Sequence, residues 1–502
     1  MELPSRCGYK ESVVCSHVSF LHPHQVFEQR PSWSELEETM ATAPAEQQKM
    51  GPVIFSSTLG TAIEWYDFFL YGTMATLVFP KVFFPKSDVF VGTLLALFTF
   101  LVGFIARPFG GALFGHLGDR IGRKSTLIAT LLLMGIATFV VGILPGYATI
   151  GVAAALILTL LRLCQGLGVG GEWGGSVLLA LEYGHKSHRG FWASWPQMGV
   201  PIGLILSTVV VSIVSATTGS NFLVWGWRIP FLLSGVLIII GLYIRLRILE
   251  TPLFVAVKSQ KHEASAPILD AFRYSTPEIL LSAGARFVEQ APFYLFTVFV
   301  ITYGVEKIGM SRALVLNSIT IAAVVELFTI PLFGYLSDRI GRRIWYLIGA
   351  VLMAIFAFPY FLLMNTASVV LFPLAVILSL ALFHAWVYGP QAALIAERFG
   401  TRSRYTGASL GYQLAAPFAG GLAPIIAVLL LNGRTNLAAL GLSSVTIGFG
   451  TGSWQAVSFY MIILAVISFV SVLGLKELTH ADISSTEAYT VTNADPVLSA
   501  TD

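Results

Sequence analysis

The chain has 502 residues, of which 55% are hydrophobic and only 11% are charged, and its mean hydropathy is +0.77. This composition excludes an ordinary soluble domain, and a net charge of +3 gives no basis for nucleic-acid binding. The spacing of the three cysteines suits neither a zinc site nor a disulfide framework, so we expect no metal and no cofactor.

The two ends of the chain are polar. Residues 1–50 contain no run long enough to span a membrane and no signal-peptide pattern, so we predict a disordered cytosolic N-terminal tail. The polar stretch 41–49 is typical of the segment before a first membrane helix, and we hypothesise that translation starts at Met40. Residues 478–502 are predicted to form a disordered cytosolic C-terminal tail.

Between the tails, the sequence contains hydrophobic stretches of about 20 residues or more, the length that a membrane helix needs. Backbone in lipid must satisfy its own hydrogen bonds, and these stretches lack the alternation of barrel strands. We therefore predict an all-α membrane protein with 12 transmembrane helices. The predicted spans are residues 53–79, 91–114, 126–145, 150–179, 191–215, 226–247, 279–304, 313–336, 344–364, 368–396, 405–431 and 456–476.

The basic residues predict the orientation of these helices. The loops after even-numbered spans hold many more Lys and Arg than the loops after odd-numbered spans. Such loops face the cytoplasm, so we predict a multi-pass protein of the cell (inner or plasma) membrane with both termini cytoplasmic. The predicted domains are an N-terminal six-helix bundle (51–247), a cytoplasmic linker (248–278) and a C-terminal six-helix bundle (279–477).

One charged loop sequence occurs twice, 219 residues apart. The first copy covers residues 115–124 and the second covers residues 334–343, and both contain Asp-Arg-Ile-Gly-Arg. This duplication predicts two pseudo-symmetric halves, which is the plan of a secondary transporter. Glutamates follow spans four and ten at nearly the same offset, which extends the repeat.

We predict that the acidic and basic residues of the two repeats form a cytoplasmic gate, which is held closed when the carrier faces outward. The alternative is that the basic residues only set the topology. The predicted gate residues are Asp119, Arg120, Arg123, Glu182, Asp338, Arg339, Arg342 and Glu397.

The duplicated loop resembles the signature of the major facilitator superfamily. Further stretches resemble its metabolite:proton symporter branch, the group with shikimate, 2-oxoglutarate and proline/betaine permeases. The resemblance covers about residues 50–478 and looks closest to the shikimate-permease-like members, although Glu326 departs from that pattern. The stretches that carry it are residues 64–72, 107–111, 161–175, 226–231 and 404–407.

Ionisable residues inside the spans are the candidate functional groups, because a charge at the bilayer centre costs about 2.5–3.5 kcal/mol on insertion scales. Glu64 and Asp67 share one face of span one, and Arg162 and Glu172 share one face of span four. Sugar:proton symporters of the superfamily pair a first-span aspartate with a fourth-span arginine, and the resemblance places Asp67 and Arg162 there. We predict Asp67 as the proton carrier and Glu64 as second choice. The alternative is a static buried ion pair.

The C-terminal half carries a second set of candidates. Arg286 and Glu289 lie one turn apart, so either they form a permanent pair or a substrate carboxylate displaces Glu289 from Arg286. His384 either relays protons or is a neutral core residue. Glu326 either faces the cavity, for proton coupling or cation binding, or pairs with Arg286.

These arguments define two predicted sites. The predicted proton-coupling residues are Asp67, Glu64, Arg162, Glu326 and His384. The predicted substrate-binding residues are Arg107, Gln165, Glu172, Arg286, Glu289, Tyr294, Tyr388 and Gln391.

The leading hypothesis is proton-coupled uptake (symport) of a small organic acid or zwitterionic metabolite by alternating access, with a shikimate-like carboxylate favoured. Export by proton antiport is the alternative, although residues 199–203 only partly match the span-five motif of exporters. A non-transporting membrane sensor is the third reading. The sequence has no nucleotide-binding loop and no nucleophile motif, so we expect no enzyme. The expected partners are a metabolite, protons and the lipid bilayer, and a monomer suffices because one chain contains both halves.

Overall fold

The computed structural model describes residues 50–85, 89–247, 267–401, 403–432, 434–436, 446–448, 453–479 and 481. The predicted N-terminal tail up to residue 49, the Met40 hypothesis, residues 248–266 of the predicted linker and residues 482–502 of the predicted C-terminal tail lie outside the described residues.

The first half of the chain forms long helices joined by short turns. Span five is divided into two helices, α8 and α9, with Pro196 in the last turn of α8. The elements are α2 (Met50–Leu77), α3 (Phe79–Val82), α4 (Val89–Ile121), α5 (Arg123–Ile143), α6 (Tyr147–Ile150), α7 (Val152–Tyr183), η1 (Lys186–His188), α8 (Arg189–Gln197), α9 (Gly199–Thr218), η2 (Gly219–Phe222) and α10 (Arg228–Leu246).

The second half is less regular, because π-helical turns interrupt spans seven, ten and eleven. Such turns are frequent at functional sites. The elements are α12 (Pro267–Tyr274), α13 (Thr276–Ala285), α14 (Phe287–Tyr294), η3 (Leu295–Phe299), α15 (Val300–Thr302), η4 (Tyr303–Ile308), α16 (Arg312–Ile340), α17 (Arg342–Met364), α18 (Leu371–Leu378), η5 (Ser379–His384), α19 (Ala385–Ala396), α20 (Arg404–Gln413), η6 (Ala416–Gly421), α21 (Ala423–Asn432) and α22 (Trp454–Leu473).

Within the described residues, eleven helical segments are long and apolar enough to cross a membrane. The remaining predicted span is α2, which has 28 residues and packs against α7, α9 and α10. The predicted twelve-helix, two-half fold is thereby confirmed. A short antiparallel hairpin, β1 (Arg434–Asn436) and β2 (Thr446–Gly448), lies between α21 and α22 and was not predicted.

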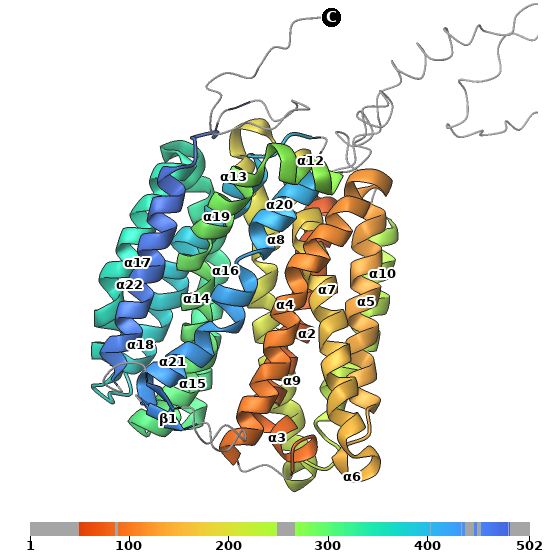
Figure 1. Cartoon of the computed structure of the whole chain (residues 1–502), viewed down its shortest axis with the longest axis vertical. Coiled ribbons are helices and arrows are strands. Elements are labelled where there is room, and N and C mark those ends of the chain that lie inside the picture. Colours follow the sequence, from red (N-terminus) through yellow and green to blue (C-terminus); the bar gives the residue numbers. More distant parts are fainter. Residues whose placement is uncertain are drawn as a thin grey trace, which may run out of the picture. The chain divides into compact units, whose positions relative to one another are not determined.

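The two halves meet along a few helix pairs. Helix α4 packs against α20 and η6, and α8 packs against α16 and α19 (Figure 1). The duplicated loops 115–124 and 334–343 both lie at the upper end of the helices in Figure 1, together with α12 and the start of α20. We call this end of the bundle the motif end.

Glycines allow α4 and α7 to cross closely. A Cβ atom at Gly166 would overlap the backbone of Gly103, and one at Gly170 would overlap the carbonyl of Arg107. Small residues at such crossings let two helix backbones approach each other in a membrane. The crossing brings Arg107 of α4 and Arg162 of α7 to the same residue of α2, Phe68.

Candidate functional site

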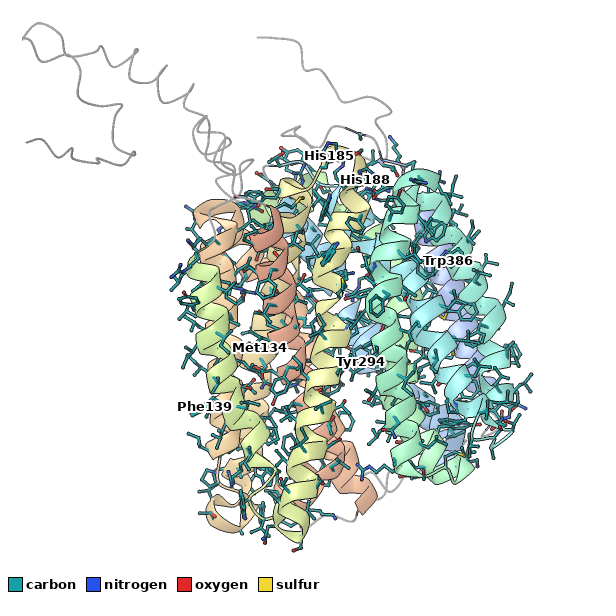
Figure 2. All side chains as sticks on the ribbon, turned by 180° about the vertical axis from the view of Figure 1, so that it is seen from behind. Met134, Phe139, His185, His188, Tyr294 and Trp386 are labelled. Carbon is teal, nitrogen blue, oxygen red and sulfur yellow. The ribbon has the colours of Figure 1, made fainter. Side chains whose placement is uncertain are left out.

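A small pocket lies where the two halves meet. Trp65 of α2 and Val200 of α9 form its N-terminal side. In Figure 2, Tyr294 lies about midway along the bundle, away from His185 and His188 at the motif end. The lining from the C-terminal half is Arg286, Glu289, Gln290, Phe293, Tyr294, His384, Tyr388 and Tyr412. The structure thus gathers five of the predicted site residues around one pocket.

Four buried ionisable side chains form a continuous chain of contacts, and three of them line this pocket. Arg286 Nε donates to Glu289 Oε2 at 3.2 Å, and Glu289 Oε1 lies 3.4 Å from His384 Nε2. On its other side, His384 Nδ1 lies 2.5 Å from Glu326 Oε1. None of the four is more than 3% exposed. The predicted alternative in which Glu326 pairs with Arg286 is not seen in this structure, because Glu326 contacts His384 and Arg286 contacts Glu289.

The charges of this chain leave one proton to be shared. Arg286 and Glu289 balance each other as a cation and an anion. The neighbouring His384 and Glu326 are neutral together only when one proton lies between them, and Glu326 Oε2 has no hydrogen-bond partner among the described residues. A strongly coupled pair of this kind takes up and releases its proton as one unit.

Both predicted glutamines lie outside the pocket lining. Gln391 Nε2 donates to the Tyr346 hydroxyl at 2.9 Å. Gln165 accepts from Arg162 Nη1 at 3.0 Å and donates to Thr138 at 2.8 Å. Gln391 therefore binds a tyrosine outside the pocket lining, and Gln165 binds residues of the N-terminal half.

The buried arginines of the N-terminal half face aromatic rings. The Arg107 guanidinium lies 4.4 Å from the centroid of Phe68 and 5.4 Å from that of Trp65, which lines the pocket. The Arg162 guanidinium lies 4.5 Å from Phe68 and 4.3 Å from Tyr71. No ion pair in the described part of the chain joins either arginine to a carboxylate. Nε and Nη2 of both have no hydrogen-bond partner there.

The expected pairing of Asp67 with Arg162 is not present in the described structure. Asp67 instead accepts a hydrogen bond from Ser234 of α10. Successive residues of a helix point about 100° apart, so Asp67 faces α10 while its neighbour Phe68 faces the two arginines. Helical spacing identified the helix faces but not the neighbour of each face.

Glu172 is also placed differently from the prediction. It lies away from the pocket and accepts hydrogen bonds from Thr61 (3.0 Å), Ser176 and Arg245 (3.1 Å). Arg245 Nη2 also lies 3.9 Å from Glu64, which brings the second predicted first-span carboxylate into the same cluster. Arg245 is one of the basic residues after the even-numbered spans, whose excess predicted the orientation of the helices. Its position at the last turn of an apolar helix gave no further signal.

At the motif end, two aspartates bind helix N-termini across the interface between the halves. Asp119 of α4 accepts from the backbone N–H groups of Tyr405 (3.2 Å) and Thr406 (2.9 Å) of α20. Asp338 of α16 accepts from the N–H groups of Gly190 (2.8 Å) and Phe191 (2.9 Å) of α8. A carboxylate at a helix N-terminus satisfies free N–H groups and complements the helix dipole.

Each aspartate site is accompanied by an arginine–glutamate–arginine cluster. Glu182 lies 3.2 Å from Arg123 and 3.5 Å from Arg404. In the repeat, Glu397 lies 3.1 Å from Arg342 and 3.3 Å from Arg189. Arg189 and Arg404 were missed as gate residues, although they lie 215 residues apart, the same offset as Glu182 and Glu397.

Two predicted gate residues do not bridge the halves. Arg120 is exposed, and Arg339 is exposed and lies over the ring of Tyr335 on its own helix, 4.6 Å from the ring centroid. Each follows a buried aspartate by one residue, and the turn of the helix directs it outward. In this structure neither arginine forms a hydrogen bond or ion pair with the opposite half among the described residues, and their gate role stays a prediction.

Two six-helix halves around a polar pocket, with paired charged contacts at one end, are the architecture of a membrane transporter. The sequence model of the Major Facilitator Superfamily matches residues 57–424, with a second match over residues 306–495. The chain therefore belongs to this superfamily.

Curated relatives are metabolite transporters. The chain is 37% identical over 450 residues to the shikimate transporter of Escherichia coli (strain K12), covering 89% of this chain and 98% of the relative. It is 34% identical to the proline/betaine transporter of Salmonella typhimurium, covering 86% of this chain and 84% of the relative. Among solved structures, the proton:xylose symporter XylE matches with a TM-score of 0.68 at 18% identity, covering 87% and 98% of the two chains. That likeness concerns the fold alone.

Proposed function

We propose that this chain carries out proton-coupled uptake of a small organic acid by alternating access. The observation that carries the proposal is the buried chain Arg286–Glu289–His384–Glu326, which opens into the pocket between the halves. One end of the chain is a pocket-lining arginine and the other is a carboxyl–imidazole pair that shares a proton. A substrate that changes the Arg286–Glu289 contact changes the field at His384, and this links substrate binding to proton binding.

The preference for an acid rests on charge. Arg107 and Arg162 are 1% and 0% exposed, and the described residues supply no carboxylate to either. A buried unpaired cation is costly, so a bound anion stabilises this region. Arg107 is the better anchor, because it borders the pocket through Trp65. Arg286 already has Glu289 as its partner. The similarity to the shikimate transporter of Escherichia coli supports the same class of substrate, because shikimate is a carboxylic acid.

The direction of access follows from the motif end, which we propose faces the cytoplasm. Asp119 and Asp338 hold α20 and α8 against the opposite half, so this end is closed in the present conformation. Separation of the halves would expose these groups to water, which replaces the lost hydrogen bonds. Such an exchange keeps the open and closed states close in free energy, as transport requires.

Uptake by purified full-length chain in proteoliposomes tests the proposal. Labelled shikimate, proline and glycine betaine are each offered with an imposed inward proton gradient, with a protonophore, and with no gradient. Accumulation of shikimate that the protonophore abolishes supports the proposal, whereas accumulation of proline or glycine betaine alone would contradict the choice of an acid over a zwitterion. Accumulation that is insensitive to the gradient contradicts proton coupling, and gradient-driven loss of preloaded compound indicates export instead.

A further inference from the structure

The cluster of Glu64, Glu172 and Arg245 lies apart from the pocket and has no role in the proposed function. Arg245 Nη2 lies 3.1 Å from Glu172 Oε1 and 3.9 Å from Glu64 Oε1. Arg245 also donates to the carbonyl of Leu127. Glu64 and Glu172 are each 2% exposed, and Arg245 is 4% exposed. Two carboxyl groups therefore share one arginine out of contact with solvent.

The two carboxyl groups have different hydrogen-bond environments. Thr61, Ser176 and Arg245 all donate to Glu172 Oε1, which stabilises Glu172 as a carboxylate. No donor in the described residues reaches either oxygen of Glu64. Both carboxyl groups lie beside the same atom, Arg245 Nη2, which is 3.1 Å from Glu172 Oε1 and 3.9 Å from Glu64 Oε1, so two acidic groups face one guanidinium nitrogen.

We infer that Glu64 holds a proton and that this cluster is a second proton-binding site, separate from the His384–Glu326 pair. With this proton the cluster is neutral, because one arginine balances one carboxylate. Without it, the cluster carries one uncompensated buried negative charge, which is costly in a low-dielectric interior. The other charged or titratable groups near Glu64 and the cluster include Asp67, one turn along α2, Tyr405 of α20, and Lys124 of α5, which lines the same pocket as Arg245.

Tyr405 covers the cluster from the opposite half. Its hydroxyl donates to the carbonyl of Gly171 at 2.6 Å, and its ring lies 2.9 Å from the position that a Cβ atom of Gly174 would take. The N–H of the same tyrosine is bound by Asp119 of the motif end. Withdrawal of α20 would therefore remove this cover together with the gate contact.

A second small pocket reaches the cluster from the motif end. The pocket is lined by Arg245, Ser176, Lys124 and Ser57. Ser57 is 2% exposed, and its hydroxyl has no hydrogen-bond partner among the described residues. Once water enters, the proton passes from Glu64 to water and the carboxylate that remains is hydrated. The site thus releases its proton at the motif end when α20 withdraws. Only this release step rests on the proposed gate; proton binding at Glu64 does not depend on the substrate.

Infrared spectroscopy of the full chain in lipid, titrated with pH and without substrate, tests the inference. A protonated buried carboxyl gives a C=O stretching band that a carboxylate lacks. We expect one such band to be lost in Glu64→Gln, shifted in Glu64→Asp, and retained in Glu326→Gln. An unchanged band in the two Glu64 variants, with Glu64→Asp folded as judged by its thermal unfolding, would overturn the proton site.

A gate variant separates a transport site from a static one. In Asp119→Ala, which weakens the hold on α20, the band of Glu64 is expected to disappear at a lower pH than in the wild type. A titration identical in the two proteins would overturn the release step. Failure of the proposed function has a different signature, since substrate uptake would then lack proton dependence while the Glu64 band persisted.

Discussion

His384 and Glu326 form a buried hydrogen bond between Nδ1 and Oε1, 2.5 Å long, although 58 residues separate them in the chain. His384 ends the π-helical turn η5 and Glu326 lies in the middle of α16. The other imidazole nitrogen faces Glu289 of the pocket. The imidazole therefore stands between a carboxyl group that lines the pocket and one that does not.

Replacement of Glu326 by Gln should uncouple transport from the proton gradient. Glutamine keeps the size of the side chain but cannot bind or release a proton, so we expect gradient-driven accumulation to fall by about 5–150-fold, the usual range of coupling free energies. Exchange of labelled for unlabelled substrate across the vesicle membrane should persist. Glu306→Gln, an exposed carboxyl of η4, is the control. Full accumulation in Glu326→Gln would show that this pair is structural.

Replacement of Arg107 by Gln should weaken substrate binding more than turnover. Loss of hydrogen bonds to a charged group costs about 1.5–3 kcal/mol, so we expect KM for the transported acid to rise about 10–150-fold. Arg228→Gln is the control, because its guanidinium binds the carbonyls of Gly142 and Leu144 outside the pocket. Uptake measured over a range of substrate concentrations gives both KM and the maximal rate. An unchanged KM would remove Arg107 from the binding site.

Replacement of Asp119 by Ala should open the motif end. The loss of a helix cap costs about 1–2 kcal/mol, which changes a population about 5–30-fold. The reporter is a cysteine at Ser409, a 1% exposed position of α20, in a chain whose native cysteines are replaced by Ser. Its labelling by a water-soluble thiol reagent should accelerate by that factor. Arg120→Ala, an exposed neighbour in the same loop, should leave the rate unchanged. Equal rates in both variants would contradict the gate.

Glu477 should stabilise the motif end in a pH-dependent manner. Its carboxylate accepts from the N–H groups of Arg342 (3.2 Å) and Arg343 (2.9 Å) at the start of α17. Burial alone raises the pKa of Glu477, but hydrogen bonds from Thr479 and Arg343 outweigh it, so the pKa lies below the ordinary 4.5. A pKa that is lower in the folded state stabilises the protein above pH 4.5, and this contribution is lost as the pH falls through the folded-state pKa.

The Glu477→Gln variant tests this sign. At neutral pH we expect it to lower the free energy of unfolding by about 1 kcal/mol, the typical value of a lost cap. Thermal unfolding of wild type and variant in detergent should differ at neutral pH and converge as the pH falls below 4.5. A difference that stays constant with pH would assign the effect to geometry instead of charge.

Local patterns were enough to predict the parts of the protein that depend on neighbours along the chain. Apolar length predicts the spans, because lipid demands helices of about 20 residues. The duplicated Asp119 and Asp338 indicated a paired contact at one end, and the spacing of Arg286 and Glu289 indicated their ion pair. These features persist whatever the rotation of each helix.

Contacts between helices were decided only by the tertiary structure. Periodicity grouped Asp67 with Glu64 on one face, yet Ser234 binds the first and Arg245 lies beside the second. The sequence gives Glu326 no partner within its own span. The packing of α16 against η5 places His384 beside Glu326. The physical reason is that a membrane helix satisfies its backbone by itself, so its sequence fixes its length and its polar face. The rotation and partners of that face follow from side-chain packing between helices far apart in the chain.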